Sequence, residues 1–276
     1  LPMLEAALDA LRGWDAEWVV ALGGGAALDM GKALAALIPA PGGIMDHLEV
    51  VGLGLPLKVA PLPFVALPTT AGTGAEATRN AVIGLPEHGR KVSIRDERML
   101  PRIAIVDPAL TDNAPRRVTL ASGLDALAQV IEPYVSVKAT PFTDALVRPV
   151  IAPGLRALMR LMQAEDAEAR DRMAWTSLCG GLALANGGLG AVHGLAGVIG
   201  GVTPAAHGAI CGVLADDRRP LRGVIAGGLF GAVLGFAGSF AWKTRPLTSA
   251  MARKAGKRIN QVRDGHWLTK HPINYG

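Results

Sequence analysis

Two short apolar runs, each ending in a loop of small residues, constrain the fold of this chain most strongly. Residues 17–22 read EWVVAL and are followed by Gly23, Gly24 and Gly25, and residues 64–67 read FVAL and are followed by Pro68. A short apolar run bounded by glycine or proline is typical of a buried strand. Residues 26–38 carry apolar residues at helical spacing and end before Pro39 and Pro41. Strands that alternate with helices predict a parallel α/β sheet.

The loops after these strands predict a binding site. Three glycines at the start of a helix place backbone N–H groups and the positive end of the helix dipole where an anion can bind. The second loop, residues 68–74, reads PTTAGTG and adds the hydroxyls of Thr69, Thr70 and Thr73. Ligands of parallel sheets bind at the carboxyl ends of strands, so the two loops suit one extended ligand. For the glycine loop alone, a plain strand-to-helix turn is an equal alternative.

The pattern changes after residue 110. Residues 103–106, IAIV, predict a third strand that ends at Asp107 and Pro108. Residues 115–135, 142–162 and 167–186 are then long stretches with apolar residues at helical spacing. We therefore expect an α/β domain over residues 1–110 and a helical domain over residues 111–217.

Residues 218–276 differ from the rest in charge. They hold 11 Lys/Arg and one acidic residue, whereas residues 1–217 hold 17 Lys/Arg and 22 Asp/Glu. The net charge of +5 comes from this tail, so we expect no nucleic-acid binding by the body of the chain. Residues 223–242 carry no charge and have a small residue at every fourth position. Membrane contact through this segment and a fusion or reading-frame artefact are both retained as alternatives.

The cysteines and the first residues bear on location. Cys179 and Cys211 lie far apart in apolar surroundings, which favours a reducing compartment. Residues 1–11 carry Glu5 and Asp9 and predict a surface helix rather than a signal peptide. We expect a cytoplasmic protein, with membrane association through residues 223–242 as the alternative.

Polar side chains in the helical part form a candidate metal site. Asp125 and Gln129 are four residues apart, so they share one face of a helix. His193 and His207 each stand next to a glycine in the same helix-rich region. An Asp with two His can bind a divalent cation and leave a position open for water or substrate. Taken singly, each of these histidines is more often structural.

Five segments, in their order and spacing, resemble the iron-containing (group III) alcohol dehydrogenases. They are residues 23–32 (GGGAALDMGK), 68–74 (PTTAGTG), 123–127 (GLDAL), 190–193 (GAVH) and 207–208 (HG). The resemblance runs from about residue 15 to residue 214 and implies the dehydroquinate synthase-like architecture. It implies that the dinucleotide-binding α/β domain and the helical domain are both partial. The first βαβ unit and most of the helical half after residue 208 lie outside the match, and the tail has no counterpart in the family.

The resemblance also implies a reaction and its residues. Family members transfer hydride between NAD or NADP and a small alcohol or its aldehyde or ketone, with Fe²⁺ or Zn²⁺ at the site. The sequence leaves the oligomeric state open, a homo-oligomer included. The matching cofactor-binding positions are Gly23, Gly24, Gly25, Asp29, Thr69, Thr70, Thr73 and Lys91. The matching metal positions are Asp125, Gln129, His193 and His207.

The chain departs from the family pattern near the metal. Gln129 stands where the family has a His ligand, and an amide is a weaker ligand than imidazole for these metals. Gly197 stands where many members carry a His proposed to relay a proton. Ala26 and Ala75 replace serines of the two cofactor loops. Three alternatives remain. The chain catalyses reduction without a tightly held metal, as the resemblance to the family's maleylacetate reductase branch allows; it is a catalytically inactive remnant; or it is a membrane-associated protein.

Overall fold

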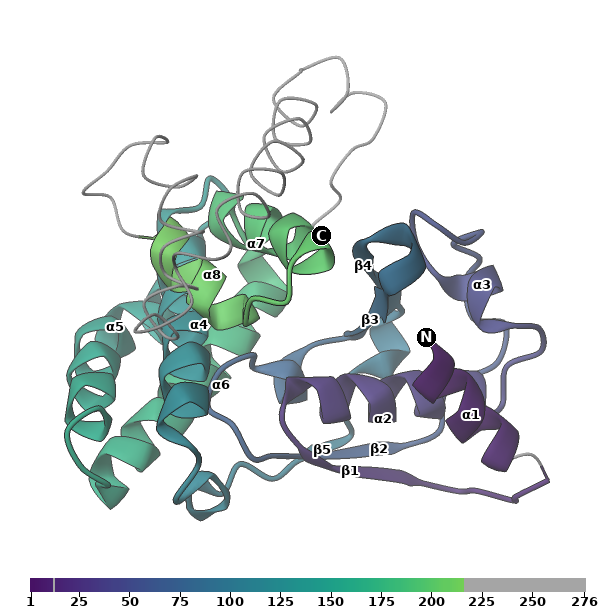
Figure 1. Cartoon of the computed structure of the whole chain (residues 1–276), viewed down its shortest axis with the longest axis horizontal. Helices are drawn as coiled ribbons and strands as arrows, with labels where there is room; N and C mark the ends of the chain where they lie inside the picture. Colours follow the sequence, from purple (N-terminus) through teal and green to yellow (C-terminus); the bar gives the residue numbers. More distant parts are fainter. Residues whose placement is uncertain (12, 216–276) are drawn as a thin grey trace, which may run out of the picture.

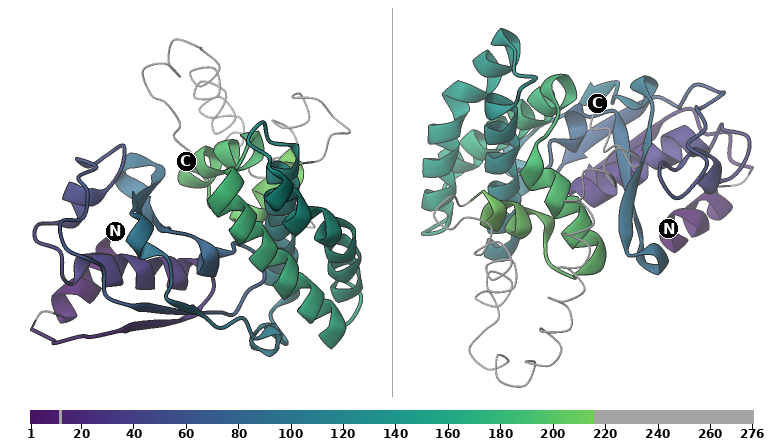
Figure 2. Two further views of the ribbon diagram at one scale, coloured as in Figure 1. Left: turned by 180° about the vertical axis from the view of Figure 1, so that it is seen from behind. Right: turned by 90° about the horizontal axis from the view of Figure 1, so that it is seen from above.

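The computed structural model describes residues 1–11 and 13–215, an α/β half followed by a helical half (Figures 1 and 2). The predicted basic tail, residues 218–276, and its apolar segment, 223–242, lie outside the described residues. The fold class expected from the sequence is confirmed, whereas the division near residue 110 into two domains stays a prediction. The helices and strands are α1 (Pro2–Ala10), β1 (Val19–Gly23), α2 (Gly25–Leu37), α3 (Ile44–His47), β2 (Phe64–Pro68), β3 (Asn80–Leu85), β4 (Arg90–Arg95), β5 (Ile103–Ala104), α4 (Arg116–Val135), α5 (Pro141–Leu161), α6 (Ala167–Gly187), α7 (Ala191–Val202) and α8 (His207–Leu214).

Three parallel strands form the sheet of the α/β half, in the order β1-β2-β5. Helix α2 lies along one face of this sheet (Figure 1). The helix comes close because Gly31 has no side chain: a Cβ there would lie 2.6 Å from the Phe64 ring and 2.7 Å from the Ala21 Cβ. The core on this face also includes Leu28 and Ala66, both fully buried.

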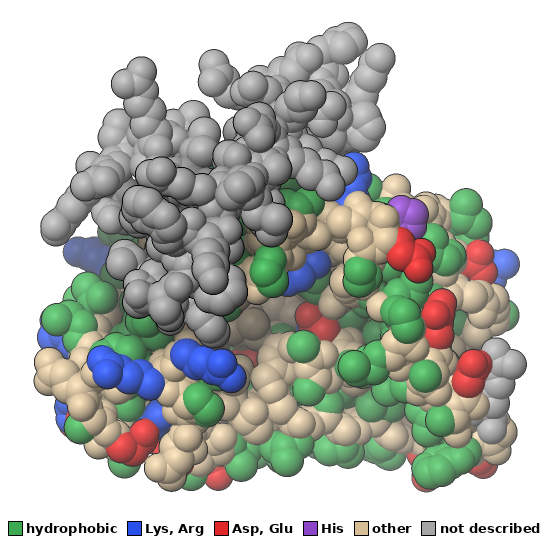
Figure 3. All heavy atoms as spheres, viewed as in Figure 1, with side chains coloured by type: hydrophobic (Ala, Val, Ile, Leu, Met, Phe, Trp, Pro, Cys, Tyr) green, Lys and Arg blue, Asp and Glu red, His purple; other side chains and the backbone are tan. Residues whose placement is uncertain are grey.

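The sequence predicts that the first strand is buried, but one face of β1 is exposed. Side chains alternate between the two faces of a strand, and in β1 only the face that carries Ala21 meets α2. Val20 is 65% exposed and Leu22 is 60% exposed on the opposite face. Figure 3 shows hydrophobic side chains along the lower edge of the molecule, where Figure 1 places the sheet. The strand is an edge strand with one apolar face uncovered by the described residues.

The exposed face of β1 can be tested by substitution. We expect Val20→Thr to change the free energy of unfolding by less than about 0.5 kcal/mol, because threonine keeps the β-branched shape and its hydroxyl stays in water. The matched control is Val130→Thr in α4, where the side chain is fully buried. Burying that hydroxyl should cost about 1–3 kcal/mol. Urea unfolding of both variants measures the difference, and equal losses would contradict the exposure of β1.

An antiparallel hairpin, β3 and β4, covers the side of α2 away from the sheet. Its alternate residues Ala81, Ile83 and Ile94 are buried in one core with Ala33 and Leu37 of α2. The hairpin was not predicted from the sequence. It carries Lys91 toward the helical half, where β4 packs against α7.

The helical half matches the sequence-based ranges closely. Helices α4, α5 and α6 begin and end within one or two residues of the stretches 115–135, 142–162 and 167–186. Helices α7 and α8 pack against α4 on the side that faces the hairpin (Figures 1 and 2). Among the described residues this half contains no strand, as predicted.

Within residues 1–11 and 13–215, no single helix is both long enough and apolar enough to cross a membrane. The bent pair α6 and α7, which meet at 102°, passes that test only when the two are taken together. The predicted membrane contact of residues 223–242 falls outside this part of the chain and stays a prediction.

Candidate functional site

The two loops predicted to bind one ligand lie side by side. The register of β1 and β2 pairs Gly23 with Pro68, so both strands end at the same edge of the sheet. The backbone N–H of Thr69 donates to the carbonyl of Gly23 at 2.9 Å. Helix α2 starts at this point, with Gly24 as its N-cap. Helix N-termini bind anions, and here the threonine-rich loop runs beside one.

Close packing explains Gly25 and Gly23. A Cβ on Gly25 would lie 2.7 Å from the Thr73 Cγ2, whereas one on Gly24 would make an ordinary contact with the Thr70 side chain at 3.4 Å. Gly23 has a φ of +155°, and a Cβ there would lie 2.6 Å from that of Ala27. Thr69 and Thr70 also line a small hollow together with Thr111, Ser122 and Arg170.

Asp29 and Lys32 lie behind the glycine loop rather than in it. Lys32 is fully buried, and its Nζ lies 3.2 Å from the Asp29 Oδ1. The same ammonium donates to the Ala75 carbonyl at 3.0 Å and to the Thr78 hydroxyl at 2.9 Å. Burial lowers the pKa of Lys32 and raises the pKa of Asp29. Asp29, predicted to contact the cofactor, thus pairs with the lysine that joins α2 to the residues after the second loop.

Lys91 of β4 faces the helical half. It is exposed, and its Nζ lies 3.5 Å from the place where a Cβ on Gly200 of α7 would stand. Its charge also lowers the pKa of His207, although burial is the larger cause of that shift. The lysine therefore adds positive charge near the two histidines.

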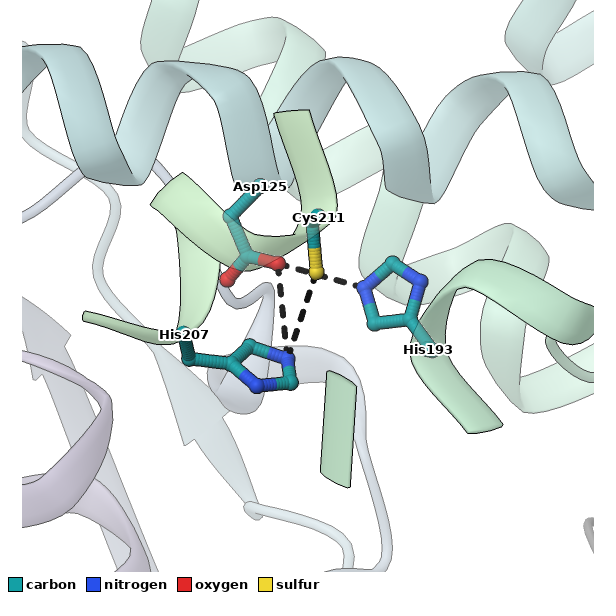
Figure 4. Close-up of side chains that lie close together, drawn as sticks. All are labelled: Asp125, His193, His207 and Cys211. Carbon is teal, nitrogen blue, oxygen red and sulfur yellow. Dashed lines mark hydrogen bonds and ion pairs between the residues drawn. The ribbon is translucent and has the colours of Figure 1, made fainter. Parts of the chain in front are cut away.

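Three of the four predicted metal ligands come together in the helical half, joined by Cys211 (Figure 4). Asp125 is on α4, His193 on α7, and His207 and Cys211 are on α8. The Asp125 Oδ1 lies 3.2 Å from the His193 Nε2 and 3.7 Å from the His207 Nε2. One ligand atom from each of the four residues lies within 4.8 Å of the other three. The separations of 3.2 and 3.7 Å are close to those of two atoms bound to one cation, so these residues fit a divalent metal.

Glu132, two turns further along α4 than Asp125, orients His193. Its Oε1 accepts a hydrogen bond from the Val192 N–H at 2.6 Å, and its Oε2 forms a short hydrogen bond with the His193 Nδ1. A carboxylate on Nδ1 leaves Nε2 as the metal-binding nitrogen, an arrangement common around metal-bound histidines. Sequence reasoning missed this residue, although its spacing of seven from Asp125 places both on one helix face.

The electrostatics of the cluster also suit a cation. Burial opposes the charged form of His193, but hydrogen bonds to Asp125, Cys211 and Glu132 outweigh it and raise the pKa of the imidazole. Burial lowers the pKa of His207 and raises the pKa of Cys211. Two buried carboxylates, Asp125 and Glu132, thus stand around the histidines. A bound divalent cation would offset that negative charge.

Gln129, the fourth predicted ligand, is bound to the second loop through its amide nitrogen. Its side-chain N–H donates to the Thr73 carbonyl at 2.8 Å, and its methylene groups lie near the position of a Cβ on Gly180. Gly72 of the same loop packs against Ser122, where a Cβ would lie 2.8 Å from the serine Cβ. The loop of residues 68–74 therefore contacts α4 on both sides of Asp125, which places the cluster of Asp125, His193, His207 and Cys211 beside it.

Two family models match the chain. Residues 1–108 match "Iron-containing alcohol dehydrogenase" and residues 119–217 match "Fe-containing alcohol dehydrogenase family, C-terminal". Among curated proteins, the chain is 38% identical over 205 residues to the NAD-dependent methanol dehydrogenase of Bacillus methanolicus, covering 74% of this chain and 52% of that protein. It is 37% identical over 199 residues to the 1,3-propanediol dehydrogenase of Klebsiella pneumoniae, covering 71% and 50%.

The solved structures agree. Sulfoacetaldehyde reductase from Bifidobacterium kashiwanohense, solved in complex with NAD⁺, superposes with a TM-score of 0.72 at 29% identity, covering 96% of this chain and 68% of that one. The chain spans about half the length of the curated relatives it matches. The two family models together cover most of the chain, and the fold and the loop and helix segments agree with them. This chain belongs to the iron-containing alcohol dehydrogenase family.

Proposed function

We propose that the chain catalyses hydride transfer between NAD or NADP and a small alcohol or its aldehyde or ketone, with a divalent cation held by Asp125, His193 and His207. The observation that carries the proposal is the meeting of these three side chains, from α4, α7 and α8, beside the paired cofactor loops. The names of the relatives, among them an NAD-dependent methanol dehydrogenase, support the same reaction class. We place the reaction in the cytoplasm, as the unpaired thiols of Cys179 and Cys211 suit.

The two loops bind the cofactor in this proposal, and the side chains of α4, α7 and α8 bind the cation. Gly23, Gly24 and Gly25 offer backbone N–H groups to the cofactor's pyrophosphate, and Thr69, Thr70 and Thr73 add hydroxyls. Asp125 and the two histidines hold the cation, with Glu132 fixing the ring of His193. A nicotinamide cofactor supplies the hydride, and a divalent cation supplies Lewis acidity toward a carbonyl oxygen. The proton that completes the reduction passes through water, the cofactor ribose or another residue, because Gly197 offers no side chain for a relay.

The direct test is NADH- and NADPH-dependent reduction of a panel of small aldehydes by the purified chain, with added Fe²⁺ or Zn²⁺ and with EDTA. We expect turnover that EDTA removes. Asp125→Asn should lower kcat/KM by about 100-fold, because Lewis-acid stabilisation is worth several kcal/mol and each 1.4 kcal/mol is tenfold in rate.

Two controls separate the parts of the proposal. Asp171→Asn changes an exposed carboxylate on α6 and should leave turnover unchanged. NADH binding, followed by fluorescence, should be retained in Asp125→Asn because the cofactor loops are intact. Turnover that is insensitive to EDTA would contradict the metal-assisted part, and absence of turnover in every condition would favour an inactive remnant.

A further inference from the structure

The buried thiol of Cys211 lies where a fourth metal ligand would stand. It is one of two free cysteines in the described chain, and its side chain is fully buried. Its Sγ belongs to the same group of converging atoms as Asp125, His193 and His207 (Figure 4). Neither the motifs nor the ligand spacing had pointed to this residue.

The position of Cys211 follows from the helix. It stands four residues after His207 on α8, so the two side chains share one face. The Sγ lies 3.6 Å from the His207 Nε2. A tetrahedral zinc with Zn–N of about 2.0 Å and Zn–S of about 2.3 Å would hold its nitrogen and sulfur ligands roughly 3.6 Å apart. The observed separation therefore matches one edge of a tetrahedral site.

Two further edges are similar. An oxygen and a nitrogen each about 2.0–2.1 Å from one tetrahedral zinc would be separated by roughly 3.3 Å. The Asp125 Oδ1 lies 3.2 Å from the His193 Nε2 and 3.7 Å from the His207 Nε2. Three edges of the site are thus close to ligand spacing, and all four ligand atoms lie within 4.8 Å of one another.

Gln129 could compete for this position only through its amide oxygen, because its amide N–H donates to the Thr73 carbonyl. A thiolate is a softer and stronger ligand than an amide oxygen for zinc. Cys211 of α8 is therefore the better donor to replace the family's histidine at residue 129.

We propose that Cys211 takes the place of Gln129 as the fourth protein ligand, giving a tetrahedral centre with one oxygen, two nitrogen and one sulfur donors that prefers zinc. The inference deepens the metal-assisted part of the proposed function and rests on it. Catalytic zinc sites in some enzymes become five-coordinate in the transition state, so a substrate oxygen can join four protein ligands in the proposed reaction. Thiolate ligation favours Zn²⁺ among the metals that such a site admits.

The test is Co²⁺ titration of the metal-free full chain, followed by absorption spectroscopy. Cobalt bound to a thiolate gives a sulfur-to-metal charge-transfer band in the near ultraviolet, and tetrahedral cobalt gives intense visible bands. We expect both in the unmodified chain and in Cys179→Ser, whose cysteine is equally buried but lies on α6 outside the cluster. Cys211→Ser should lose the charge-transfer band and bind Zn²⁺ about 100-fold more weakly, since even outer-shell changes cost 10–100-fold.

A second variant guards against misfolding. Cys211→Asp keeps a metal-binding side chain, so it should retain Co²⁺ binding and the visible bands while losing the charge-transfer band. If the unmodified chain binds Co²⁺ without that band, Cys211 is not a ligand, although the metal site of the proposed function stands. If it binds no Co²⁺ at all, both this inference and the metal-assisted part of the proposed function are wrong, and EDTA-insensitive turnover would agree with that result.

Discussion

Alanine in place of Gly208 is expected to lower the free energy of unfolding by about 2–4 kcal/mol, since overpacking a rigid contact costs 1–3 kcal/mol and sometimes more. Gly208 of α8 rests directly on α4. A Cβ there would overlap the carbonyl oxygen of Ala121 and would lie 3.0 Å from the Asp125 Cβ. A backbone carbonyl held in a helix cannot rotate away as a flexible side chain can. Helix α8 must therefore move, and His207 and Cys211 would move with it, away from Asp125.

Two measurements check this result. Thermal unfolding should show a fall in Tm of about 5–10 °C for a chain of this size, and zinc content after dialysis should fall in parallel. The matched control is Gly197→Ala in α7, where a Cβ would meet no atom within 4 Å. That variant should be neutral or more stable by up to about 1 kcal/mol, because alanine is the better helix former. Equal losses in both variants would mean that the α4–α8 contact is looser than the structure places it.

The sequence predicted best those features that depend on short-range spacing. Apolar residues at helical period set the ranges of α4, α5 and α6, and the structure reproduces them. The two cofactor loops were also predictable as neighbours, because parallel strands such as β1 and β2 end at one edge of a sheet. The motif spacing then brought Asp125, His193 and His207 into one hypothesis, and the structure places these three side chains together.

Features that depend on how helices cross were not readable from the sequence. Cys211 lies near Asp125 only because α8 approaches α4 through Gly208. Glu132 reaches His193 because the start of α7 lies over the second half of α4. Neither approach has a local signal. The spacing of apolar residues and the turn residues define where each helix begins and ends. They do not define which faces of two helices pack together.

The exposed face of β1 and the hairpin illustrate the same limit. An apolar run such as residues 17–22 predicts a strand, but the run does not say which faces other elements cover, and here α2 covers one. The alternation in β3 and β4 was present in the sequence, with Ala81, Ile83 and Leu85 buried. To predict a hairpin from this alternation, residues 86–89 must be recognised as a turn. In that turn Gly89 takes a left-handed φ of +56°.

Lys32 is the residue of the α/β half whose loss is expected to cost most. Its side chain is fully buried and binds Asp29, the Ala75 carbonyl and the Thr78 hydroxyl. Through these bonds one ammonium ties α2, which begins at the glycine loop, to the chain that continues from the threonine loop. Lys32→Met should therefore lower the free energy of unfolding by about 3–5 kcal/mol, as expected when one partner of a buried pair is removed and the other is left charged.

The same change should also weaken cofactor binding. Without the ammonium, residues Ala75 and Thr78, which follow the loop of residues 69–74, lose their bonds to the helix that starts at Gly25. The two loops proposed to bind the cofactor are then less firmly held together. We expect the Kd for NADH, measured by fluorescence titration, to rise at least about tenfold. Lys58→Met, which removes an exposed lysine from a loop, is the control and should leave both stability and NADH binding within error.

The double variant Asp29→Asn with Lys32→Met decides whether charge or shape matters at this position. Burial is the main cause of both pKa shifts, downward for Lys32 and upward for Asp29. Each charged form therefore carries a desolvation cost that its partner offsets. Methionine fills the space of the lysine stem, and asparagine removes the charge that Lys32→Met leaves unpaired. The double variant should therefore unfold at higher urea than Lys32→Met alone, because a neutral pair avoids the isolated buried carboxylate. If the two changes instead add, the pair is not coupled, and the stability of Lys32 comes from its bonds to Ala75 and Thr78.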